Sequence, residues 1–155
     1  MQFINYFFAS VVSFLGLLVG IILVRIAPEE QKPLEKYFVL LRRIFLLLVF
    51  IFLMFYYFNK TFYILTLAVY LVFLLFVEYQ LNDQIMKSMI IYTILGILFF
   101  ASISNQNLFV IESSLIFLYG IPAASLVYSR KNKNYSGIFF SNFGFIAVST
   151  ILFFI

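Results

Sequence analysis

Long uninterrupted apolar stretches restrict the fold of this chain more than any other feature. Residues 44–58, IFLLLVFIFLMFYYF, contain no charged side chain, and similar stretches recur along all 155 residues. A helix needs about 20 apolar residues to cross the hydrocarbon core of a bilayer. Because the stretches are continuous rather than alternating, they exclude a transmembrane β-barrel. The sequence therefore predicts an all-α integral membrane protein.

The composition agrees with this prediction. Charged residues make up 10% of the chain and apolar residues 65%, whereas a soluble domain carries roughly 25% charged residues. We place six spans in a single transmembrane domain, 1–155, which leaves no room for a soluble domain. Their expected bounds are about 3–25, 38–58, 62–79, 84–102, 108–128 and 137–155. Asn82 or Asp83 should cap the fourth. Three spans plus three is the arithmetic of an inverted repeat, but the two halves share no pattern that establishes one.

The basic residues predict the orientation of the chain. Nine of the ten lie in or beside the loops after the first, third and fifth spans, and only Lys60 lies in a loop on the opposite side. Short cytoplasmic loops are enriched in Lys and Arg. We therefore expect both termini on the non-cytoplasmic side of a cell membrane, or of the inner membrane of an organelle. The nine are Arg25, Lys32, Lys36, Arg42, Arg43, Lys87, Arg130, Lys131 and Lys133.

Half of the sixteen charged residues fall in residues 25–43, RIAPEEQKPLEKYFVLLRR. Pro28 suits the first position of a short helical turn, and a new helix should begin at Pro33 and continue into the second span. Topology explains the basic residues of this loop but not its acidic ones, which indicate a loop of defined shape. The candidate contacts with anionic lipid head groups or with another membrane subunit are Glu29, Glu30, Glu35, Lys36, Arg42 and Arg43. Arg42 or Arg43 can also meet Glu78, which lies at the same membrane face.

Two short stretches resemble known proteins. APEEQKPLEKYF, residues 27–38, resembles a loop of uncharacterised small multi-pass proteins of archaea, a resemblance that implies no activity. VYLVFLLFV, residues 69–77, is similar to the third helix of NADH dehydrogenase subunit 6. The glycine expected soon after that family's tyrosine is replaced here by residues 71–73, LVF, and the number of spans differs.

Glu112 is the carboxylate predicted to lie inside the bilayer. It follows Asn107 by five residues, which places it roughly 7 Å below the outer surface. An intramembrane carboxylate is costly and raises a functional hypothesis. The alternatives are a coupling or selectivity carboxylate of a transporter or channel, and a Glu that reaches water or bonds to a neighbouring helix. Other polar residues within spans, such as Tyr92 and Asn142, are expected to form interhelical hydrogen bonds.

Small residues recur at spacings of four, three and four in the first span. Such a stripe lets two helix backbones approach closely, either within one bundle or between two chains. A shorter stripe in the sixth span offers a mate. The two stripes are Ala9, Ser13, Gly16 and Gly20, and Gly137, Ser141 and Gly144.

The residue types that are missing argue against an enzyme. The chain has no His and no Cys, and its one aspartate is Asp83. Ser–His chemistry, imidazole-bound metals, haem ligation and an aspartyl dyad therefore lack their residues. We expect no cofactor, no metal and no nucleic-acid partner. The first hypothesis is a non-catalytic structural or accessory membrane subunit. The alternative is a small transporter or channel that uses Glu112, and a minor one is an organelle-type respiratory subunit.

Overall fold

The computed structural model describes residues 2–130 and 135–155 and is all-α. Six helical segments within these residues are long and apolar enough to cross a membrane, as expected. The prediction that Asp83 caps a helix is also confirmed, because its carboxylate accepts a hydrogen bond from the Ile85 backbone N–H. The elements are α1 (Phe3–Phe14), α2 (Gly16–Ile26), η1 (Pro28–Glu30), α3 (Gln31–Tyr56), α4 (Thr61–Gln80), α5 (Gln84–Ala101), η2 (Ser102–Ser104), α6 (Gln106–Arg130), α7 (Tyr135–Asn142) and α8 (Gly144–Phe154).

The first and sixth spans each consist of two helices joined at a bend. The Leu15 N–H donates to the carbonyls of both Val11 and Val12, so one tighter turn separates α1 from α2. Phe143 occupies the same position between α7 and α8, with its N–H bonded to the Phe140 carbonyl. Such 3₁₀-type turns bend a helix without leaving backbone groups unpaired.

The charged loop is folded. Pro28 begins the short turn η1, as expected. Helix α3 begins at Gln31, two residues before the expected start at Pro33, and then runs unbroken to Tyr56. Pro33 is tolerated because the first N–H groups of a helix have no intrahelical partner. Lys131 and Lys133 lie outside the described residues.

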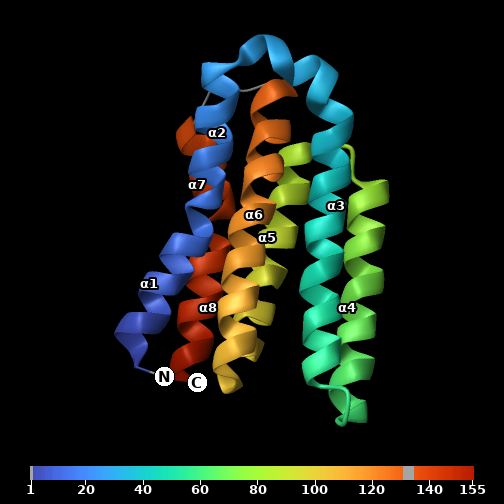
Figure 1. The fold of residues 1–155 in the computed structure, drawn as a ribbon, viewed down its shortest axis with the longest axis vertical. Helices are drawn as coiled ribbons and strands as arrows, with labels where there is room; N and C mark the ends of the chain where they lie inside the picture. The colour runs from blue at the N-terminus through green and yellow to red at the C-terminus, as the bar shows by residue number, and fades with distance from the viewer. Residues whose placement is uncertain (1, 131–134) are drawn as a thin grey trace.

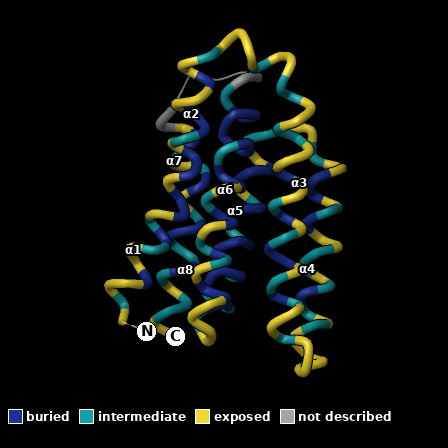
Figure 2. The backbone as a smooth tube through the Cα atoms, viewed as in Figure 1, coloured by how far each residue is buried: buried dark blue, intermediate teal, exposed yellow. Residues whose placement is uncertain are grey.

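Helix α6 occupies the middle of the bundle. Figure 1 shows it between α2 and α3, with both chain termini at one end of the molecule and the η1 turn at the other. Termini at the same end agree with an even number of spans. Figure 2 shows the buried positions concentrated on α5 and α6, whereas α4 is largely exposed. The share of buried residues is 61% in the α6 span and 22% in the α4 span, so α6 is the core helix.

Glycines set the distance between α2 and α6. A Cβ atom on Gly16 would overlap the carbonyl oxygen of Phe117, and one on Gly20 would overlap that of Ile121. From the other side, a Cβ on Gly120 would lie 2.7 Å from the backbone of Gly16. The small-residue stripe of the first span is therefore a contact inside the monomer.

The expected mate of that stripe was wrong for its two glycines. Gly16 and Gly20 lie against α6, and Gly144 of the sixth span packs elsewhere: a Cβ on Gly144 would lie 2.8 Å from Thr93 Oγ1 on α5. A Cβ on Gly96 of α5 would in turn lie 2.8 Å from the Phe145 carbonyl oxygen. Spacing identifies the face of a helix that can make a close contact, but it does not identify the helix that meets it.

We expect Gly16→Ala to destabilise the folded protein, because its added methyl group meets backbone that cannot rotate away. Overpacking of this kind costs about 1–3 kcal/mol. The measurement is thermal unfolding in detergent micelles, with Leu18→Ala on the outward face of α2 as control. An unchanged midpoint for Gly16→Ala would contradict the contact between α2 and α6.

Candidate functional site

A buried ion pair joins α3 to α4. Arg42 Nη2 lies 2.5 Å from Glu78 Oε1, and the two side chains are 3% and 2% exposed. Arg42 Nη1 also donates to Gln84 Oε1 on α5 at 3.0 Å. The expected contact between Arg42 and Glu78 is therefore present, and it connects three helices at the end of the bundle opposite the termini.

Two further cations surround Glu78. Arg43 Nε lies 3.4 Å from the same carboxylate oxygen, and its guanidinium group lies 4.7 Å from the centre of the Tyr79 ring. The Lys87 ammonium group donates to the backbone carbonyl of Glu78 at 2.7 Å and is itself buried. The sequence identified Lys87 only as a basic residue near a loop, because nothing in its spacing shows that it turns inward.

Arg42 does not lie where a lipid contact would. Consecutive residues of a helix point about 100° apart, so one arginine of this pair can face inward while the other faces outward. The structure places Arg42 inside the bundle and leaves the Arg43 side chain 39% exposed. Of the two arginines, only Arg43 has a partly exposed side chain.

Glu112 is fully buried in α6. Neither of its carboxylate oxygens has a hydrogen-bond partner among the residues that the structure describes. It lies in the second turn of α6, and α6 begins at the end of the bundle where the termini lie. Burying a polar group without a partner is costly, and burying an unpaired charge is far more so. The burial of Glu112 is therefore unfavourable for the folded protein, whatever its protonation state.

The hydroxyl groups of Tyr119 and Tyr92 are two further buried polar groups beside α6. Tyr119 follows Glu112 by two turns on the same face of α6, about 10 Å along the axis, and its ring lies 5.6 Å from that of Tyr92 on α5. Both hydroxyls are buried and lack a partner among the described residues. Glu112 and Tyr119 thus form a line of buried polar groups along α6, with Tyr92 beside it.

The expectation of interhelical hydrogen bonds holds for one polar residue and fails for another. Asn142 Oδ1 accepts a hydrogen bond from Ser88 Oγ at 2.8 Å, which joins α7 to α5. The Tyr92 hydroxyl instead lies against the backbone of α6: a Cβ on Gly120 would come within 2.8 Å of it. No signal in the sequence distinguishes these two outcomes, because each depends on the atom that the neighbouring helix presents.

The acidic residues of the charged loop lie far from Glu112. Glu29, Glu30 and Lys36 are exposed on η1 and the first turns of α3, and Glu35 is half-buried there. In the part of the chain that the structure describes, no group of three or more His, Cys, Asp or Glu residues comes together that could hold a metal ion. The candidate functional site is therefore the line of buried polar groups, with Glu112 as its isolated carboxylate.

No protein-family model, curated protein or solved structure matches this chain. Neither of the two local resemblances is therefore accompanied by a family assignment. The function has to be argued from the buried groups themselves.

We expect Arg42→Gln and Glu78→Gln to be strongly coupled. Removing one partner of a buried ion pair leaves an uncompensated charge, at a cost of about 3–5 kcal/mol, while the double variant leaves no such charge. The measurement is a double-mutant cycle on unfolding free energies in detergent. A cycle of Arg43→Gln with Glu78→Gln serves as control and should show weaker coupling, because Arg43 is partly exposed. Additive effects for Arg42 and Glu78 would contradict the pair.

Proposed function

We propose that the protein is a small proton-coupled transport protein of the membrane, with Glu112 as its coupling carboxylate. The observation that carries the proposal is the complete burial of Glu112 with no partner for either oxygen. Ionisable groups within membrane spans mark ion pathways and proton relays by default. A role in coupling gives a reason for a side chain that otherwise only weakens the core.

The proposed step is a change of protonation at Glu112. In apolar surroundings a carboxyl group is stable only when neutral, and it can release its proton once water or a polar partner reaches it. In the arrangement described here, Glu112 is closed off from the exterior of the bundle. This structure then corresponds to an occluded, protonated state, and transport requires a second state in which Glu112 is accessible.

The groups along α6 support a route toward the opposite end. Hydroxyl groups both donate and accept hydrogen bonds, so Tyr119 and Tyr92 can relay a proton once they are hydrated or repositioned. Beyond them, the Arg42–Glu78 pair closes the bundle at the basic end. In this proposal the ion pair is a gate, and its opening would connect the tyrosines to the loops at that end.

A second candidate is the non-catalytic structural or accessory subunit. The observation that favours it is the exposed apolar surface of α4, where Phe62 is 80%, Val72 66% and Phe76 60% exposed. Lipid chains or another membrane subunit would cover this surface. The exposed charges of the η1 turn would then contact that subunit or the anionic head groups beside it.

We also propose that both termini lie on the non-cytoplasmic side. The support is the collection of basic residues at the end where η1 lies, away from the termini. Since the chain has no cysteine, single-cysteine variants report on one position each. In intact cells, a membrane-impermeant maleimide should label Gln2→Cys and leave Glu29→Cys unlabelled until the membrane is permeabilised. The reverse labelling pattern would contradict this orientation.

For the transport function, we expect Glu112→Gln to abolish proton flux. The measurement uses the purified protein in liposomes that contain a pH-sensitive dye, with a potassium diffusion potential to drive protons inward. The amide has nearly the same shape as the carboxyl group but cannot exchange a proton. Glu29→Gln changes an exposed carboxylate of η1, at the end of the bundle opposite the start of α6, and should keep the wild-type flux.

Flux that survives Glu112→Gln would remove the coupling role. Absence of flux from the wild-type protein, together with partner chains that co-purify in stoichiometric amounts, would favour the accessory subunit instead. A hydrophobic carbodiimide, which reacts with protonated carboxyl groups, gives a measurement that needs no transported substrate. The proposal expects an adduct at Glu112, identified by mass spectrometry, because the accessible state exposes this group.

A further inference from the structure

A cavity with two polar residues in its lining lies apart from the buried polar groups along α6. It has a volume of about 250 Å³ and opens between α2 and α3, directly beside the η1 turn. Its walls are apolar, and only two of its lining side chains are polar. The lining residues are Leu23, Val24, Ala27, Glu30, Gln31, Leu34 and Phe38.

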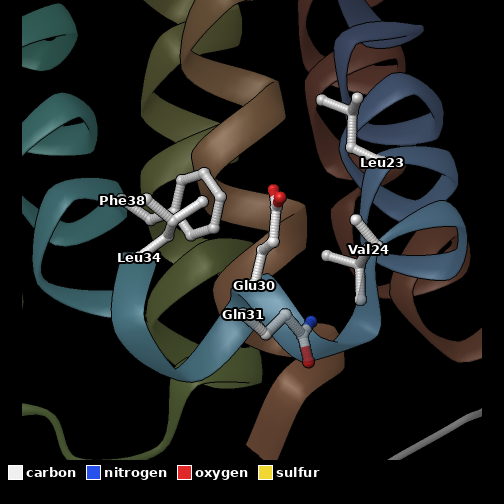
Figure 3. A pocket seen from close by; sticks show the side chains of 7 residues that line it. Leu23, Val24, Glu30, Gln31, Leu34 and Phe38 are labelled. Carbon is white, nitrogen blue, oxygen red and sulfur yellow. The ribbon is translucent and has the colours of Figure 1, made fainter.

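Figure 3 shows the Glu30 carboxylate projecting between the side chains of α2 and those of α3. No hydrogen bond or ion pair is recorded for this carboxylate within residues 2–130 and 135–155. The Gln31 Nε2 atom, on the next residue, is shielded from solvent and has no hydrogen-bond partner among the described residues. The cavity thus combines an exposed carboxylate that has no protein partner among the described residues, a shielded amide donor without one, and apolar walls.

This combination specifies the ligand. A carboxylate at the end of an apolar cavity favours a cation and repels an anionic head group. An unpaired acceptor favours a cation that can donate hydrogen bonds, so a primary ammonium group fits better than a quaternary one. The free Gln31 amide calls for an oxygen acceptor close to that ammonium group. The volume is smaller than the roughly 300–1,000 Å³ of typical small-molecule sites, and therefore fits a head group with the first part of one hydrocarbon chain.

The position of the cavity selects a membrane lipid over a water-soluble amine. Its walls belong to the first two of the segments that are long and apolar enough to span a membrane, Phe3–Ile26 and Pro28–Tyr56. Leu23 lines the cavity and is also 47% exposed on the outer surface of α2, and the adjacent Ile22 is 43% exposed. A hydrocarbon chain leaving the cavity would therefore continue along apolar surface that already faces the lipid.

We propose that the cavity between α2 and α3 binds the head group of a lipid that carries a primary ammonium group. Glu30 accepts hydrogen bonds from the ammonium group, and Gln31 donates to a phosphate or ester oxygen of the same lipid after a small rotation of its side chain. This site is separate from Glu112 and does not depend on the transport proposal. It also differs from the anionic lipid contacts expected from the basic residues of the loop.

The experiment is native mass spectrometry of the full-length protein in detergent, with equimolar phosphatidylethanolamine, phosphatidylcholine and phosphatidylglycerol of identical acyl chains. The wild-type protein should retain phosphatidylethanolamine about tenfold more than phosphatidylcholine, the discrimination expected from one charge-assisted hydrogen bond. Glu30→Gln should lose this preference. The matched control Glu29→Gln, one residue away on the same turn, should keep it.

Ala27→Leu provides an independent variant, because it fills the cavity without changing any charge. It should reduce retention of phosphatidylethanolamine while leaving the Glu30 carboxylate in place. Equal retention of the three lipids by the wild-type protein would overturn the proposal, and so would a preference for phosphatidylglycerol. A preference for phosphatidylethanolamine that survives both Glu30→Gln and Ala27→Leu would place its binding elsewhere and would also overturn it.

Discussion

The close approach of α2 and α6 is the contact on which the rest of the bundle depends. Lipid provides little hydrophobic driving force for helix association, so helices in a membrane associate through close packing and hydrogen bonds. Gly16 and Gly20 bring the α2 backbone against the Phe117 and Ile121 carbonyls. This contact fixes one side of α6, and α3 and α5 also pack against this helix, in which Tyr119 and Glu112 are buried.

The two buried carboxylates of this chain are in opposite situations. The Glu78 carboxylate forms ion pairs with Arg42 and Arg43, and Lys87 donates a hydrogen bond to the Glu78 backbone carbonyl. The negative charge of Glu78 is therefore compensated inside the bundle. Glu112 has no comparable partner among the described residues. The ion pairs of Glu78 hold helices together, which explains why this carboxylate is buried. The burial of Glu112 has no such explanation, and the functional proposal therefore rests on Glu112 rather than on Glu78 and its cationic neighbours.

Much of the fold could be read from the sequence, and so could part of the site. Apolar length predicted six spans because hydrocarbon thickness sets helix length. A contact of Arg42 or Arg43 with Glu78 was predicted because these residues lie at the same membrane face. The inward turn of Lys87 and the pairing of Gly144 with α5 could not be predicted. Both depend on how each helix is rotated about its own axis, which decides the residues that face a neighbouring helix. Apolar side chains suit the lipid as well as the core, so an apolar sequence does not show which face of a helix turns inward.

The sequence by itself determined the class of fold, the number of spans, the position of Glu112 within a span and the collection of basic charge at one side. These features follow from the length, apolarity and charge of each segment, which can be read without knowing which helices are neighbours. Only the tertiary structure decided which helix meets the small-residue stripe, which arginine is buried, and that Glu112 lacks a partner. It also decided that the Glu30 carboxylate projects into a cavity between α2 and α3. Each of these depends on the atoms that neighbouring helices present to one another, and packing settles that only when the whole bundle assembles.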